Sequence, residues 1–305
     1  MTRENEKKGM SLFPHRIKYA TIGGSVMKQA TITVRRMNRA DVDLAIDWAA
    51  LEGWNPGLND AESFYCADPN GFFMAEVNGE PAGCISAVAY DDTFGFMGFY
   101  IVRPDLRHEG IGMALWHAAM KYMGERVIGG DGVVAMLDKY ALCGFRIAHH
   151  NARYEGIGRA SSSRLVDLAD VPFAELVSYD RRFFPAPRTA FLKSWISQFG
   201  SHCQAVMAGG RLLGYGVIRP CRRGFKIAPL FADTPDIAEE LFVSLASIAR
   251  DEPVFFDIPV CNQAARQLVD RHAMTMVFET ARIYRGTPPG LPLDQIYGIT
   301  SFELG

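Results

Sequence analysis

The first clear pattern of hydrophobic and polar positions starts at Thr31, where apolar and polar residues alternate over 31–37 as in a β-strand. Asn38 follows as a helix N-cap, with Asp41 at the capping-box position. The next apolar residues recur on one helical face: Val42, Ala45, Ile46 and Ala49. The pattern therefore predicts a strand followed directly by an amphipathic helix.

Further strands and helices follow up to about residue 156. Two β-rich runs within 71–90 meet at Asn78-Gly79, the dipeptide most typical of a tight hairpin. The apolar run 94–102 predicts another strand, and helical spacing resumes at Ile111. The remaining pattern predicts a strand, a second helical run and a closing strand over 126–130, 132–144 and 145–156.

The same order of elements then repeats. The polar, small-residue segment 156–164 is typical of a linker, and after it strands, helices and a hairpin recur in the earlier order. The alternation is mixed rather than strictly βαβ. We therefore predict an α/β (α+β) fold with an N-terminal extension over 1–30 and two domains, 31–158 and 164–305. Each domain should have a mostly antiparallel mixed sheet flanked by helices.

Composition agrees with two compact domains and narrows the function. The 305 residues are 49% hydrophobic and 22% charged, enough to bury two cores. A formal net charge of -2 removes the usual electrostatic argument for a nucleic-acid or membrane partner. Six scattered cysteines without a C-x-x-C pair, and no recognisable secretory leader, favour a cytoplasmic protein. We expect a monomer or homodimer.

An Arg-x-x-Gly-x-Gly motif, RHEGIG over 107–112, lies between the strand 94–102 and the following helix. A helix N-terminus presents unbonded N–H groups and a positive dipole end, and glycine lets an anion approach closely. The motif lacks the third glycine of the dinucleotide-binding fingerprint. It therefore predicts a pyrophosphate site, with an ordinary strand-to-helix turn as the alternative.

The element order, the stretch YIVRPDLRHEGIGMAL and the later YALCGF together resemble the GNAT superfamily of acyl-CoA-dependent N-acetyltransferases. The resemblance implies acetyl-CoA as cosubstrate and no metal. The cofactor-binding residues that it implies are Tyr100, Ile101, Val102, Arg107, His108, Glu109, Gly110, Ile111 and Gly112. It also implies that Tyr140 is the general acid that protonates the departing thiolate, although a tyrosine there can equally pack its helix onto the sheet. Because the Glu109 carboxylate would repel phosphates, we expect only its backbone N–H to face them.

The general base is left unassigned by the residues. Asp131 follows an apolar strand, where a carboxylate can reach a cleft, and Asp138 lies on the next helix. A helix cap and a solvated face are their alternative roles. Trp54, between turn residues in GWNPG, is predicted to line the acceptor pocket, with core packing as the alternative.

The second domain differs at the position of the anion motif. It reads APLFADTPDIAEE over 228–240, with Asp233 and Asp236 but neither arginine nor Gly-x-Gly. An acidic helix N-terminus disfavours pyrophosphate. We therefore predict that coenzyme A binds only the first domain, and that the second is a degenerate GNAT-like copy that contributes Asp257 and Asn262 to the acceptor site.

The function implied is N-acetyl transfer from acetyl-CoA to a primary amine of a small molecule, by direct attack through a tetrahedral intermediate. Two alternatives stay open. One is an acyl-CoA-binding sensor or partner-binding protein without turnover, and the other is a peptide or protein acetyltransferase.

Overall fold

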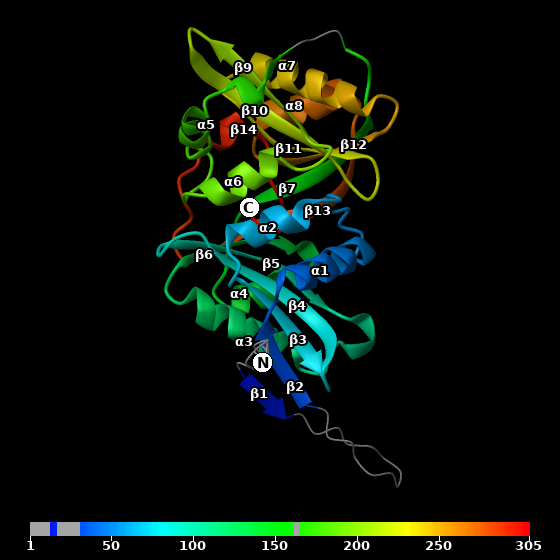
Figure 1. Cartoon of the computed structure of the whole chain (residues 1–305), viewed down its shortest axis with the longest axis vertical. Helices are drawn as coiled ribbons and strands as arrows, with labels where there is room; N and C mark the ends of the chain where they lie inside the picture. Colours follow the sequence, from blue (N-terminus) through cyan, green and yellow to red (C-terminus); the bar gives the residue numbers. More distant parts are fainter. Residues whose placement is uncertain (1–12, 17–30, 162–164) are drawn as a thin grey trace, which may run out of the picture.

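The computed structural model describes residues 13–16, 31–161 and 165–305. Its strands form one continuous mixed sheet in the order β1-β2-β3-β4-β5-β6-β13-β7-β12-β11-β10-β9-β8, with β14 paired to β11. The first half of the chain (31–161) and the second half (165–305) lie at opposite ends of the long axis (Figure 1). The predicted α/β class, with a mostly antiparallel mixed sheet flanked by helices, is confirmed.

The two halves repeat the same order of elements. The first half consists of β2 (Thr31–Arg36), α1 (Arg39–Leu51), α2 (Asp60–Ala67), β3 (Phe72–Val77), β4 (Glu80–Ala89), β5 (Phe94–Val102), α3 (Ile111–Met123), β6 (Val127–Val133), α4 (Leu137–Leu142) and β7 (Arg146–Ile157). The second half consists of β8 (Val166–Asp167), α5 (Phe173–Asp180), α6 (Thr189–Ile196), β9 (His202–Ala208), β10 (Arg211–Pro220), β11 (Phe225–Ala232), α7 (Pro235–Ala246), β12 (Pro253–Pro259), α8 (Gln263–Arg271), β13 (Thr275–Arg285) and β14 (Ile296–Gly298).

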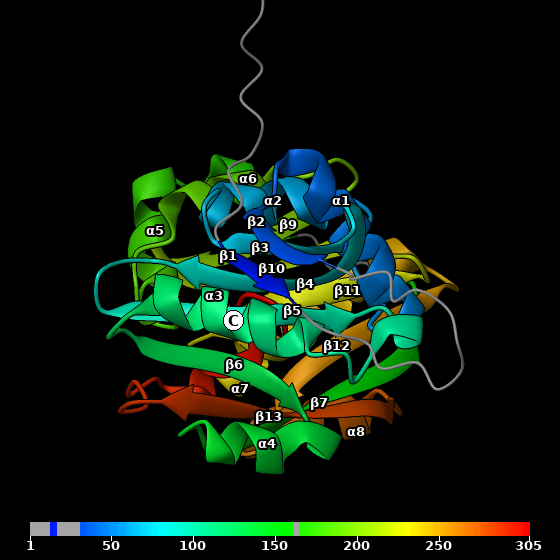
Figure 2. The same ribbon diagram turned by 90° about the horizontal axis from the view of Figure 1, so that it is seen from below.

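The two halves exchange their closing strands. β13, from the second half, pairs antiparallel with β6 of the first half through Thr280↔Val133 to Arg285↔Ile128. β7, from the first half, pairs antiparallel with β12 of the second half. The order β6-β13-β7-β12 is visible from below (Figure 2). Each half therefore completes its sheet with a strand of the other.

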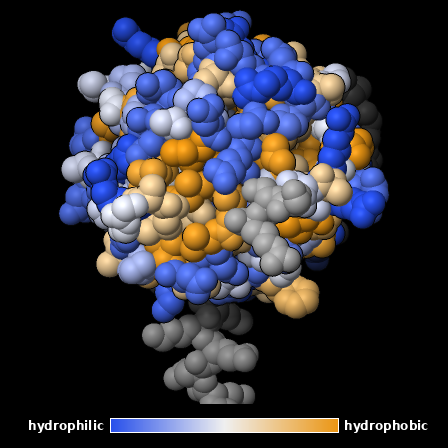
Figure 3. All heavy atoms as spheres, turned by 90° about the horizontal axis from the view of Figure 1, so that it is seen from above, coloured by the Kyte–Doolittle hydropathy of each residue, from blue (hydrophilic) through white to orange (hydrophobic). Residues whose placement is uncertain are grey.

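A shared core also joins the halves. Phe64 of α2 stacks on Trp195 of α6, with ring centroids 5.9 Å apart. The Asp60 carboxylate accepts two bonds, of 2.7 and 3.0 Å, from the buried Arg219 guanidinium of β10. The other sheet faces carry separate cores, under α3 in the first half and under α7 and α8 in the second. Seen from above, hydrophilic side chains surround smaller groups of hydrophobic ones (Figure 3). No helix in the described ranges is long and apolar enough to cross a bilayer.

Two predicted elements differ from the structure. Residues 13–16, inside the expected N-terminal extension, form β1 and pair antiparallel with β2, whereas the rest of 1–30 lies outside the described residues. The helical run expected over 132–144 is shorter, because β6 continues to Val133 through its pairing with β13. Only α4, over Leu137–Leu142, is α-helical there.

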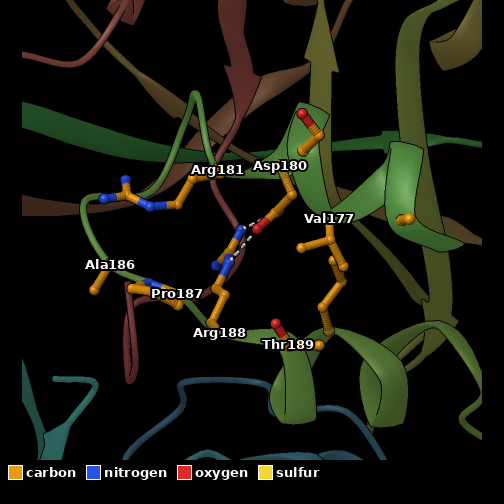
Figure 4. Close-up of a pocket in the computed structure, with 10 residues that line it drawn as sticks. Val177, Asp180, Arg181, Ala186, Pro187, Arg188 and Thr189 are labelled. Carbon is orange, nitrogen blue, oxygen red and sulfur yellow. Dashed lines mark hydrogen bonds and ion pairs between the residues drawn. The ribbon is translucent and has the colours of Figure 1, made fainter.

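A hollow of about 350 Å³ lies between α5 and α6 in the second half. Its polar centre is the buried pair of Arg188 and Asp180, which share two bonds of 2.8 and 2.6 Å (Figure 4). Because the two charged groups bind each other, neither is left free to bind a ligand in this hollow.

Candidate active site

The main cavity opens where β5 and β6 diverge. Their parallel pairing ends at Met97↔Gly130, although β5 continues to Val102 and β6 to Val133. A register shift against β4 and the positive φ of Phe99 (47°) mark a bulge in β5 just beyond that point. Such a bulge terminates pairing and turns the strand away from its neighbour. The cavity between them has a volume of about 590 Å³.

Both halves line this cavity. Side chains of the first half form one wall of the cavity and the end that lies near α3, which we call the donor end. Side chains of the second half come from β13 and from the segment after β14. The lining residues from the second half are Phe278, Thr280, Ile283, Phe302 and Glu303. The predicted site residues that line the cavity are Tyr100, Ile101, Val102, Arg107, His108, Gly110, Gly112, Tyr140, Trp54 and Asp131.

The start of α3 has the geometry of an anion site. Gly110 (φ 78°) and His108 (φ 71°) take left-handed conformations that turn the chain into the helix. Ala114 is the first residue whose N–H bonds to a backbone carbonyl, that of Gly110 at 3.1 Å. Within the described chain, the N–H groups of Ile111 and Gly112 therefore have no acceptor, and they are free to bind phosphate oxygens.

The side chains of this loop are used differently from the expectation. Arg107 donates to the Val102 carbonyl at 3.0 Å and forms an ion pair with Glu52, so part of its charge is neutralised. Glu109 does not line the cavity, and the expected contact of its backbone N–H with phosphate stays a prediction. The Ile111 side chain is buried in the core under α3, so it too can contribute only its backbone.

Tyr140 of α4 lies in the cavity wall among aromatic rings. Its ring centroid is 6.1 Å from that of Trp116 and 6.4 Å from that of Phe145. Burial, with smaller contributions from Tyr100 and Cys143, raises the pKa of Tyr140 to about 12. The hydroxyl is therefore protonated at neutral pH and can donate a proton. The same ring packs α4 onto the sheet, so the two roles considered for it are compatible.

Asp131 lines the cavity, but its carboxylate is already bound. Arg282 of β13 donates to it twice, at 3.0 and 2.8 Å, and the Asn151 amide donates at 2.8 Å. Burial raises the pKa of Asp131 despite these partners. This carboxylate is neither a helix cap nor a free base. It links β6 to the strand received from the second half.

Asp257 and Asn262, which we predicted to contact the acceptor, do not line this cavity, and both side chains have partners within the protein. Asp257 of β12 binds the guanidinium of Arg153 twice, at 2.6 and 2.7 Å, which makes its role one of buried charge pairing. Asn262 caps α8 by accepting from the Ala265 N–H at 3.1 Å, and its amide donates to the Ile296 carbonyl at 2.9 Å. A capping asparagine gives the same sequence signal as a binding residue.

Sequence reasoning missed the second-half residues that do line the cavity. Phe278 and Thr280 belong to a strand that the pattern predicts, but its place beside β6 depends on pairing between distant segments. Thr280 is 2% exposed, and its hydroxyl has no hydrogen-bond partner among the described residues. Glu303 lies after the last strand, and its only signal is one acidic residue among apolar ones in SFELG.

Comparison with known proteins supports the same assignment in both halves. The family model described as "Acetyltransferase (GNAT) family" matches residues 41–144, and the one described as "Acetyltransferase (GNAT) domain" matches residues 176–298. A curated relative, the holothin acyltransferase of Pseudoalteromonas sp. (strain SANK 73390), is 28% identical over 295 residues, covering 92% of this chain and 97% of its own.

Solved structures share the fold over most of the chain. A putative acetyltransferase from Pyrococcus horikoshii has a TM-score of 0.76 at 20% identity, over 90% of this chain and 96% of its own. A tandem GNAT protein from the clavulanic acid biosynthesis pathway has a TM-score of 0.59 at 14% identity, over 85% of this chain and 100% of its own. The tandem arrangement thus occurs in a related fold.

Proposed function

This chain belongs to the GNAT family of acetyltransferases, with two of the family's domains in tandem, and we propose that it acetylates a small primary amine with acetyl-CoA. The observation that carries the proposal is the cavity that opens between β5 and β6. One end of the cavity lies at the unbonded N–H groups of α3, and the walls of the other end come from both halves.

The residues present fit an acyl-CoA molecule at the donor end. The N–H groups of Ile111 and Gly112 would hold the pyrophosphate, since nothing in the described chain accepts from them. Beyond the bulge at Phe99, the backbone of Tyr100–Val102 would face the pantetheine arm along the unpaired edge of β5. Acetyl-CoA would supply an acyl group activated as a thioester.

The chain's own groups account for proton delivery. Tyr140 is protonated at neutral pH and lines the cavity beside α3, so it would give its proton to the leaving sulfur. A positioned acid of this kind contributes about a hundred-fold or more to the rate. Trp54, which lines the same cavity, would contact the acceptor.

The acceptor end favours a small amine without a carboxylate group. Its walls include Trp54, Phe278 and Phe302, which give an apolar, aromatic surface. Arg153 lies over the rings of Phe278 and Phe302, and Arg282 over that of Phe96. Both guanidinium groups are held in bidentate pairs with aspartates and are not available to bind a carboxylate. The name of the curated relative, holothin acyltransferase, supports an acyl-transfer reaction.

We also propose that the second half binds no coenzyme A. Its corresponding helix, α7, is capped by the Thr234 hydroxyl, which accepts from the Ile237 N–H at 3.3 Å. The preceding Asp233 accepts from Tyr179 at 2.9 Å and pairs with Arg182 at 3.0 Å. The Ile237 N–H at this end is thus already bonded, and Asp236 adds negative charge to the first turn, which disfavours phosphate. The cytoplasmic location and the monomeric or homodimeric state stay predictions from the sequence.

The test is release of free thiol from acetyl-CoA across a panel of amines, with the acetylated product identified by mass. Ring-bearing amines without a carboxylate should react, and their amino-acid counterparts should react more slowly. If no amine releases thiol above the hydrolysis rate while acetyl-CoA still binds, the sensor alternative replaces the enzyme. Preferential acetylation of peptide N-termini would instead support the peptide acetyltransferase.

A further inference from the structure

The segment after β14 crosses between the halves and ends against β5. Glu303 packs so closely on Gly98 that a Cβ at Gly98 would overlap the Glu303 carbonyl oxygen. Both backbone polar groups of the neighbouring Leu304 are bonded, since its N–H donates to the Ser301 hydroxyl at 2.9 Å and its carbonyl accepts from the Tyr90 hydroxyl at 2.9 Å. The chain therefore fixes Glu303 in the cavity wall, beside the bulge of β5.

Three charged groups surround Glu303, from three other elements: Lys226 of β11, Arg153 of β7 and Asp60 of α2. All three have closer partners. Arg153 binds Asp257, and Asp60 binds Arg219. Lys226 donates to the Asn55 carbonyl at 3.1 Å.

The carboxylate of Glu303 is consequently left without an ion-pair partner among the described residues, in a side chain that is 5% exposed. Other acidic groups near the cavity do not share this property, because Asp131 is bound by Arg282 and Asn151, and Glu52 by Arg107. The carboxylate accepts a hydrogen bond from its own backbone N–H, but a buried charge with no opposite charge in contact is costly unless a ligand supplies one. An ammonium or amine N–H is the group that a carboxylate in an aromatic pocket would bind.

We propose that Glu303 is the general base of the reaction. The inference rests on the proposed function, because it assigns the proton acceptor for the same transfer. As the amine nitrogen forms its C–N bond to the acyl carbon, its proton passes to the Glu303 carboxylate. As the C–S bond breaks, the proton of Tyr140 passes to the sulfur. Solvent then returns a proton to Tyr140 and removes one from Glu303, so that the products are an amide and a free thiol.

The electrostatic surroundings suit this role. Burial raises the pKa of Glu303, while Lys226 and Arg153 oppose that effect and keep the ionised form accessible. A base works best when its pKa approaches the pH of the reaction. An ordinary exposed glutamate, with a pKa of about 4.3, would be a weaker acceptor for the amine proton.

The alternative role for Glu303 is to balance the charges of Lys226 and Arg153 without contact with the acceptor. The variant Glu303→Gln keeps the shape and removes both the base and its negative charge. The two roles then differ in what changes: loss of a base lowers kcat, whereas loss of charge balance lowers stability and leaves the kcat of the folded protein near the wild-type value. We expect the kcat of Glu303→Gln to fall about a hundred-fold or more, with the acetyl-CoA affinity measured by calorimetry unchanged. In the pH profile of kcat/KM, the part of the decrease at acidic pH that comes from protonation of Glu303 should also be absent in this variant.

A second variant, Glu303→Ala, tests the same base by rescue. Added formate should restore part of its activity in proportion to concentration, and it should leave the wild type unaffected. Full activity of Glu303→Gln, or a folded Glu303→Ala that formate does not rescue, would overturn the assignment. These outcomes differ from failure of the proposed function, in which the wild type itself transfers no acetyl group to any amine.

Discussion

Substitution of Gly112 by glutamate provides a sharp test of the donor site. Gly112 is half-buried at the first turn of α3, and a Cβ there would lie 2.8 Å from the Tyr100 hydroxyl oxygen. The new carboxylate would also stand among the N–H groups that we assign to the phosphates. Two like charges about 4 Å apart repel by about 1 kcal/mol in water and about 4 kcal/mol at an effective dielectric of about 20. Because the site is half-buried, we expect the affinity for acetyl-CoA to fall about a hundred-fold or more.

Isothermal titration calorimetry measures this loss together with the stoichiometry. The wild type should bind one acetyl-CoA per chain, and Gly112→Glu should bind far more weakly. Gly112→Ala isolates the steric part, and the deficit of Gly112→Glu relative to it should shrink in high salt. Gly290→Glu is the matched control, since a Cβ at Gly290 would meet no described atom within 4 Å and Gly290 lies outside the cavity lining. An affinity of Gly112→Glu within about three-fold of the wild type would refute the phosphate assignment.

Three further predictions concern buried groups. Tyr140→Phe should lower kcat about a hundred-fold without weakening acetyl-CoA binding, and an unchanged kcat in the thiol-release assay would remove Tyr140 as the acid. Asp60→Asn leaves the buried Arg219 without its carboxylate and should lower the urea-measured free energy of unfolding by about 3–5 kcal/mol, whereas Asp47→Asn, at an exposed ion pair, should change it by less than about 1 kcal/mol. Burial lowers the pKa of His149 to about 4, so the stability from its neutral form is complete above about pH 6.5 and is lost as the pH falls toward 4. Between pH 6.5 and 5, the free energy of unfolding of His149→Gln should therefore decrease by about 2 kcal/mol less than that of the wild type. Equal decreases, measured by urea unfolding at the two pH values, would contradict the burial argument.

Local features of the fold were predictable because neighbouring residues determine them. The Asn38 side chain accepts from the Asp41 N–H and the Asp41 side chain accepts in return, as the capping box requires. Asn78 and Gly79 take positive φ values of 55° and 88° in the predicted hairpin turn. The anion motif likewise lies at the predicted start of α3. Each of these signals is complete within a few residues.

The acceptor end could not be predicted because distant segments form it. β6 and β13 pair although about 150 residues separate them, and periodicity carries no information about such a partner. The ion pair of Arg107 with Glu52 has the same origin, since the two residues meet only when α1 packs beside the motif. Glu303 belongs to no regular element, so neither a period nor a motif marks it.

The strand exchange explains what the second half contributes without an anion loop of its own. β13 closes the first half's sheet through its backbone bonds to β6 and β7 and through the pair of Arg282 with Asp131. Phe278 and Thr280 are two residues apart and line the same cavity, as alternate positions on one face of a strand do. Substitutions at these two positions would therefore alter the acceptor pocket while the pairing that supports the donor site is kept. The cavity uses the second half as a wall, so this arrangement does not require a phosphate site in that half.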